Sequence, residues 1–185
     1  TSTNIKLLII LNDIINMKLF FIYLITFTLS FQLQLFSAPM KMIGMKGKAS
    51  DVSKTIKVDM YDNYYEPKTI NVKKGETVRF VVENKGVLVH EFNIATMMMH
   101  KKHGPEMLDM MKMGILLPNK INKEKMKQMA KMNPKMAHSH ANSVLLEPKQ
   151  RAELIWKFTS DAELFGGCNV PGHLEAGMIS KININ

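Results

Sequence analysis

Apolar and polar residues alternate in several short segments between residues 54 and 184. Ile56, Val58 and Met60 are separated by polar residues, which is typical of a strand with one buried face. This pattern predicts strands at 54–60, 69–72, 77–83, 87–94, 143–146, 151–158, 161–168 and 178–184. Seven or eight short strands separated by turns indicate an all-β protein, and we predict a β-sandwich.

One long segment interrupts this strand pattern. Residues 97–141 consist mainly of Met, Lys, His and Asn, and β-branched residues almost disappear from them. Helices are expected near 105–113 and 122–132, because helix-forming residues fill these stretches and prolines follow both of them. A segment of this length is too long for an ordinary loop. We therefore predict a Met/His/Lys-rich, partly helical insertion at 97–141.

The residues before the first strand divide into three parts. Residues 1–16 precede the first methionine, and we interpret them as a non-native upstream extension. Residues 17–38 begin with a positive charge, continue with an apolar stretch and end in a more polar exit, as in a secretory signal peptide. An uncleaved membrane anchor is the alternative. Residues 39–53 read as a flexible lead, so the folded domain is expected at 54–185 in the periplasm.

The chain is basic, and most of its excess charge lies in the insertion. Its formal net charge is +9, and nine lysines in 97–141 face only three acidic residues. Paired-cysteine zinc signatures, helix-turn-helix patterns and RNA-binding aromatic motifs are absent from the sequence, so no mechanism for nucleic-acid binding is apparent. The lysines form either a solvated basic face or a surface that steers an acidic partner.

The single cysteine points to a metal site. Exported proteins use cysteine mostly in pairs, so Cys168 is a ligand, a nucleophile, an intermolecular bridge or an inert residue. Four residues separate Cys168 from His173, and four more separate His173 from Met178. Two imidazoles, a thiolate and a weak thioether together form a ligand set that suits redox-active copper. The loop supplies three of these groups, and His90 on an apolar strand is the natural fourth.

Zinc and cysteine catalysis are weaker interpretations of the same residues. Zinc favours several cysteines or histidines, and methionine is a poor ligand for it. A Cys–His nucleophile would need an orienting group and an oxyanion hole, which the sequence does not reveal. Multicopper oxidases and nitrite reductases need further histidine clusters and a second domain. We therefore predict no enzymatic activity and no catalytic residues.

The tail C-x4-H-x4-M, with Pro171-Gly172 before the histidine and Ala176-Gly177 before the methionine, resembles the cupredoxins. Together with the upstream segment 86–92, it is most similar to the auracyanin-like and bacterial copper-tolerance-associated branch. The resemblance implies a Greek-key β-sandwich with one type 1 copper ion. Its ligands would be His90, Cys168, His173 and Met178. One departure is Glu91, because many cupredoxins have Asn or Ser after the first histidine.

The insertion offers further soft-metal chemistry. It holds eleven of the 17 methionines and His100, His103, His138 and His140. The methionines are explained equally well by helix packing and by weak additional Cu(I) binding. The segments Met97–His100 and Met136–His140 lie at the two ends of the insertion. They are the better candidates for a second copper region.

Two functions remain open from the sequence. The first is periplasmic electron transfer by a mononuclear type 1 copper protein, with a c-type cytochrome or a copper oxidase as partner. The alternative is copper tolerance, with Cu(I) sequestered or delivered through the insertion and a copper-handling protein as partner. Neither function involves nucleic acid, and a membrane is involved only if the signal segment stays uncleaved.

Overall fold

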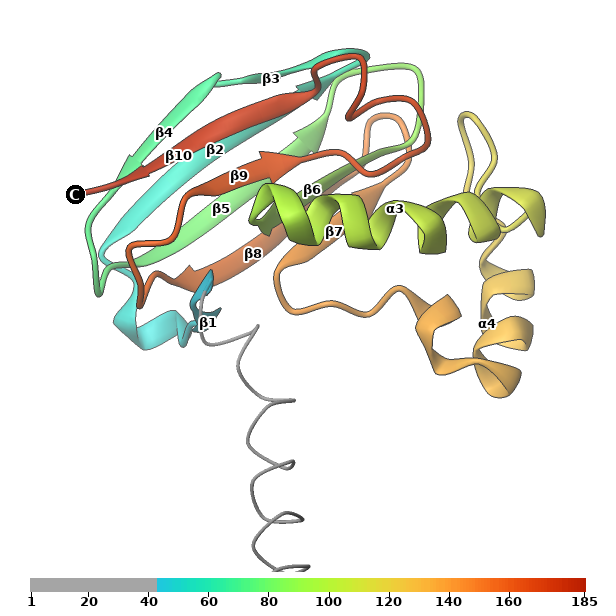
Figure 1. The fold of residues 1–185 in the computed structure, drawn as a ribbon, viewed down its shortest axis with the longest axis horizontal. Coiled ribbons are helices and arrows are strands. Elements are labelled where there is room, and N and C mark those ends of the chain that lie inside the picture. Colours follow the sequence, from blue (N-terminus) through green and yellow to red (C-terminus); the bar gives the residue numbers. More distant parts are fainter. Residues whose placement is uncertain (1–42) are drawn as a thin grey trace, which may run out of the picture. The chain divides into compact units, whose positions relative to one another are not determined.

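The computed structural model describes residues 43–185, which contain two five-stranded β-sheets (Figure 1). In strand order, the first sheet consists of β1 (Met45–Lys46), β8 (Arg151–Lys157), β5 (Thr77–Asn84), β2 (Lys54–Tyr61) and β3 (Tyr64–Glu66). The second consists of β4 (Thr69–Val72), β10 (Ile179–Ile184), β9 (Leu164–Gly167), β6 (His90–Ala95) and β7 (Ser143–Leu146). The predicted all-β sandwich is confirmed.

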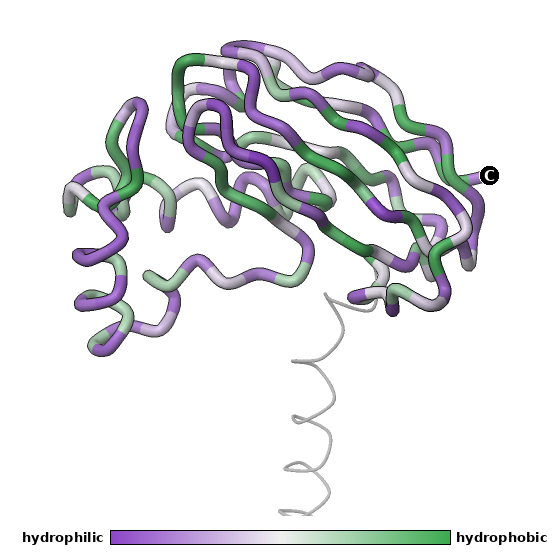
Figure 2. Tube along the Cα trace, turned by 180° about the vertical axis from the view of Figure 1, so that it is seen from behind, coloured by the Kyte–Doolittle hydropathy of each residue, from purple (hydrophilic) through white to green (hydrophobic). Residues whose placement is uncertain are grey.

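Large apolar side chains from both sheets form one core. Phe80 on β5 lies 5.6 Å from Phe92 on β6 and 6.2 Å from Phe158, measured between ring centroids. Val58 and Met60 are fully buried, as the alternation in this strand predicts. Figure 2 shows this alternation as changes between purple and green along the strands. Most strand pairs are antiparallel, but β2 pairs with β5 and β10 with β4 in parallel.

The sandwich includes residues N-terminal to the first predicted strand. β1 lies within 39–53 and pairs with β8, and a 3-10 turn follows it at Ala49–Asp51. Ile43 is fully buried, and its carbonyl oxygen accepts a hydrogen bond of 2.9 Å from the indole N–H of Trp156. β3 was also not predicted, because it has only three residues. The proposed upstream extension and signal peptide lie outside the described residues.

The insertion contains two α-helices and a 3-10 turn, η2 (Pro134–Ala137). Helix α3 (Met97–Lys112) begins eight residues before the predicted helix, because Thr96 caps it and the helix runs through Pro105. The Thr96 hydroxyl accepts a hydrogen bond from the backbone N–H of Met99. Helix α4 (Lys123–Met132) lies close to its predicted position. No helix between residues 43 and 185 combines the length and apolar character that a membrane span requires.

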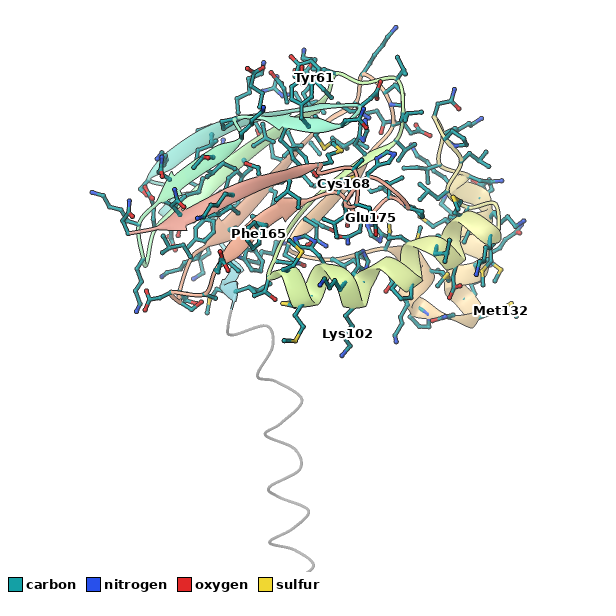
Figure 3. All side chains as sticks on the ribbon, turned by 45° about the horizontal axis from the view of Figure 1, so that its top comes forward. Tyr61, Lys102, Met132, Phe165, Cys168 and Glu175 are labelled. Atoms are coloured by element: carbon teal, nitrogen blue, oxygen red, sulfur yellow. The ribbon has the colours of Figure 1, made fainter. Side chains whose placement is uncertain are left out.

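Part of the methionine content of the insertion serves packing. Met107 and Met110 of α3 and Met136 of η2 are buried in a second apolar cluster with Ile115 and Leu116. Other methionines are exposed, and Met98 and Met132 are 80% and 81% accessible. Figure 3 labels Met132 and Lys102 on the helical part of the molecule. The packing explanation therefore holds for some of the methionines.

Candidate metal centre

Three of the four predicted ligands meet at one end of the sandwich. His90 is the first residue of β6, Cys168 directly follows β9, and His173 lies in the turn after it. Figure 3 labels Cys168 where β9 passes into this loop. The Cys168 sulfur lies 3.4 Å from Nδ1 of His173 and 4.0 Å from Nδ1 of His90. The two Nδ1 atoms are 3.2 Å apart.

These separations fit three ligands around one ion. Imidazole nitrogen and thiolate sulfur bind first-row ions such as zinc at about 2.0–2.3 Å, so trigonal ligands lie roughly 3.6 Å apart. The observed separations of 3.2, 3.4 and 4.0 Å bracket that value. Two imidazoles and one thiolate in a trigonal arrangement are the donor set of cupredoxin-type copper. The residues present therefore fit a copper ion.

Asp62, which sequence analysis did not single out, orients His90. Its Oδ1 lies 2.9 Å from Nε2 of His90 and accepts hydrogen bonds from the backbone N–H groups of Val87 and Leu88. This contact assigns the proton of the neutral imidazole to Nε2 and leaves the Nδ1 lone pair free for a metal. No local pattern marks Asp62, because it lies 28 residues before His90 in the chain.

The electrostatics of this pair favour a neutral imidazole. Burial lowers the pKa of His90, although the Asp62 carboxylate partly opposes this effect. Burial alone would raise the pKa of Asp62, but hydrogen bonds from His90, Leu88 and Val87 outweigh it and lower the pKa. A neutral imidazole is the form that binds metal ions.

Cys168 has the surroundings of a ligand and not of a reactive thiol. Its side chain is fully buried, and this burial raises the pKa of the thiol to about 12. Reactive cysteines are partly exposed and have lowered pKa values. The backbone N–H of Glu91 lies 3.4 Å from the sulfur and donates to it. Of the four roles that the sequence left open for Cys168, these observations disfavour those of nucleophile and intermolecular bridge.

The backbone closes the loop that carries the predicted fourth ligand. Met178 donates its N–H to the carbonyl of His173, and its own carbonyl accepts from the N–H of Cys168. The Met178 side chain is fully buried in the sandwich core. The fold thus holds Met178 beside the loop of Cys168 and His173, and its role as thioether ligand stays a prediction.

Glu91 occupies the position after the first ligand histidine, where many cupredoxins have Asn or Ser. Its side chain is fully buried, and its Oε2 accepts a hydrogen bond of 3.2 Å from the backbone N–H of Asn169. Asn169 follows Cys168, and Glu91 follows His90. The carboxylate therefore joins the two ligand-bearing segments, which is the function expected of the residue at this position.

His100 is a structural residue. It is fully buried, and its Nδ1 lies 2.8 Å from Oδ1 of Asn169 while its Nε2 lies 3.3 Å from the carbonyl oxygen of Phe165. Both ring nitrogens therefore have partners beneath the metal loop. The segment Met97–His100 does not present this imidazole to a second metal.

Comparisons with known proteins show the family to which the chain belongs. Residues 21–118 match the family described as "Cupredoxin-like domain", and the chain belongs to this family. It is 42% identical over 147 residues to the copper-resistant cuproprotein CopI of Pseudomonas aeruginosa, covering 76% of this chain and 81% of that protein. It is 33% identical over 140 residues to the copper-resistant cuproprotein CopI of Rubrivivax gelatinosus, covering 75% and 71%. The predicted family and its copper-tolerance branch are confirmed.

Solved structures support the same fold. An auracyanin B structure has a TM-score of 0.53 at 11% identity, covering 77% of this chain and 94% of that chain. The reduced auracyanin of Roseiflexus castenholzii has a TM-score of 0.52 at 16% identity, covering 72% and 98%. At these identities the likeness concerns the fold alone.

Proposed function

We propose that this protein binds one copper ion through His90, Cys168, His173 and Met178 and serves copper tolerance in the periplasm. The observation that carries the proposal is the convergence of two Nδ1 atoms and one sulfur within 4.0 Å of one another. When bound, copper supplies a one-electron couple that this mixed set of nitrogen and sulfur ligands accommodates in both oxidation states. The names of the related copper-resistant cuproproteins support the physiological role.

The surroundings of His173 support copper handling. A cavity of about 200 Å³ is lined by His173, Leu88 and Pro171 on the sandwich side and by Met111 and Leu116 of the insertion. His173 is only partly buried, and Met111 is 44% exposed. A thioether is a soft ligand that selects Cu(I). We therefore expect Met111 to contact Cu(I) on its way to or from His173.

The chain's own residues keep the ligands in position. Asp62 holds the His90 ring in the tautomer that offers Nδ1, and Glu91 joins the segments that carry His90 and Cys168. Burial of Cys168 keeps water away from the sulfur. We expect the ligands to bind copper without large rearrangement of the fold.

The test compares the wild-type protein with Cys168→Ser. Adding Cu(II) to the wild type should produce strong visible absorption from thiolate-to-copper charge transfer, and Cys168→Ser should lack it. In the source organism, deletion of the gene should increase copper sensitivity, and only the wild-type gene should restore growth. A wild-type protein that folds but gives no such absorption would contradict the copper site. Full restoration of growth by the Cys168→Ser gene would contradict the role of the copper site in copper tolerance.

Electron transfer is a second candidate, favoured by the donor set of two imidazoles and one thiolate, which suits copper in both oxidation states. Stopped-flow mixing of the reduced copper protein with an oxidised c-type cytochrome would test this function. Rapid exchange that slows at high salt is expected if the basic insertion steers the encounter. Failure to exchange electrons with cytochromes and copper oxidases would leave copper handling as the function.

A further inference from the structure

A second cluster of potential ligands lies within the insertion. His103 and Glu106 lie three residues apart on α3, and His138 and His140 follow η2. One ligand atom from each of these four residues lies within 4.8 Å of the others. The ring centroids of the three histidines are 5.0–5.2 Å apart. Two segments of the insertion, 32 residues apart between Glu106 and His138, thus bring together three imidazoles and a carboxylate.

Glu91 reaches this cluster from the sandwich. Its Oε1 is buried and lies 3.0 Å from Nε2 of His138 and 3.4 Å from Nε2 of His103. Neither contact has the direction of a hydrogen bond. Among the described residues, Glu91 Oε1, His103 Nε2 and both ring nitrogens of His138 lack hydrogen-bond partners. Buried polar atoms are normally paired, so close atoms that face one another without hydrogen bonds are the arrangement expected of ligands around a cation.

The charges in the cluster match a divalent cation. Glu91 and Glu106 contribute two negative charges, and neutral imidazoles contribute none. The Glu106 carboxylate lies 3.4–3.9 Å from ring nitrogens of all three histidines, so negative charge from Glu91 and Glu106 faces the same group of imidazoles. The alternative to a metal ion in this cluster is a proton on His138. Burial lowers the pKa of His138, but Glu106 and Glu91 outweigh it and raise the pKa to about 9.

We propose that His103, His138, His140, Glu106 and Glu91 form a second metal site. It would bind a divalent late transition-metal ion through imidazole nitrogens and carboxylate oxygens. These ligands suit Cu²⁺ and Zn²⁺, and the general order of affinities places Cu²⁺ first. The absence of sulfur from this donor set separates it from the site at Cys168. His140 is 35% exposed, so an ion has a route from solvent.

The test uses a Cys168→Ala background, which removes the thiolate of the first site. Equilibrium dialysis against a competing chelator, followed by metal analysis, measures Zn²⁺ and Cu²⁺ binding in separate samples. We expect one equivalent of each ion to be retained. His140→Ala and Glu106→Gln should each weaken binding at least about tenfold. Glu124→Gln, which changes an exposed carboxylate on α4, is the matched control and should bind as the background does.

Spectroscopy identifies the ligands directly. In the Cys168→Ala background, the electron paramagnetic resonance spectrum of bound Cu²⁺ should show coupling to several imidazole nitrogens, and His140→Ala should change it. If His140→Ala does not fold, nuclear magnetic resonance of the background protein should show Zn²⁺-dependent shifts of the imidazole signals of His103, His138 and His140. Equal binding by His140→Ala, Glu106→Gln and Glu124→Gln would overturn the proposal. So would a folded background protein that retains neither ion.

Discussion

Asp62 provides a direct test of how the copper site is held. The Asp62→Ala substitution removes the oxygen that contacts Nε2 of His90 at 2.9 Å and leaves the ring free to rotate or to change tautomer. Loss of a hydrogen-bond partner behind a ligand histidine typically weakens metal binding 10–100-fold. This corresponds to about 1.4–2.8 kcal/mol in binding free energy. We expect copper affinity to fall within this range.

The same substitution also affects folding, and the two effects can be separated. Asp62 accepts hydrogen bonds from the N–H groups of Val87 and Leu88, and each such bond contributes about 0.5–1.5 kcal/mol. Asp62 is 36% exposed, so water replaces part of this loss. We expect the free energy of unfolding without metal to fall by about 1 kcal/mol. Asp62→Asn keeps an acceptor oxygen and should preserve copper affinity within about tenfold.

The assay is competition between the protein and a chelator of known affinity, followed through visible absorption of the copper protein. Asp161→Ala is the matched control, because Asp161 is an exposed aspartate paired with Lys74. We expect a weakened and shifted absorption only for Asp62→Ala, with recovery in Asp62→Asn. A folded Asp62→Ala protein with the affinity and absorption of the wild type would refute the role of Asp62 in orienting His90.

Three further predictions concern the packing that supports the site, each measured by guanidinium unfolding of the metal-free protein. Phe80→Ala should lower the free energy of unfolding by about 3–5 kcal/mol, because it empties the centre of the core, and a loss below about 1 kcal/mol would contradict this. Gly166→Ala should lower it by about 1–3 kcal/mol, since the new Cβ would lie 2.2 Å from a ring carbon of Phe92; unchanged stability would count against this contact. Asn84→Ala should cost about 1–3 kcal/mol, because the carbonyl of Leu146 loses a buried donor. It should also weaken copper binding in the chelator competition, because the carbonyl of Leu88, two residues before His90, loses the same donor. Copper affinity equal to the wild type would disprove the second effect.

The sequence predicts those parts of the structure that depend on local spacing. The alternation around Val58 and Phe80 identifies strands because side chains in a strand point to opposite faces in turn. The spacing from Cys168 to His173 predicts the candidate metal loop because one tight turn brings the Cys168 sulfur to within 3.4 Å of Nδ1 of His173. His90 is predictable as the second imidazole from the chemistry of copper, since the loop itself offers only one.

The remaining parts depend on contacts between distant segments. Asp62 lies in the turn between β2 and β3, and only the folded sandwich places it against His90. The sequence predicts the start of α3 eight residues too late, because the helix begins after the cap at Thr96 and continues through Pro105. His103 could not be paired with His138 from the sequence, since their contact depends on how α3 packs against η2.

Glu91 connects the two sites physically. Its backbone N–H donates to the Cys168 sulfur, one carboxylate oxygen accepts from Asn169, and the other faces His103 and His138. A cation bound in the insertion would fix the position of this carboxylate, and the backbone N–H of the same residue donates a hydrogen bond to the Cys168 sulfur. Hydrogen bonding around the thiolate tunes the potential of this type of copper site. Glu91, the residue that departs from the family pattern, is therefore in contact with both the Cys168 sulfur and the histidines of the insertion.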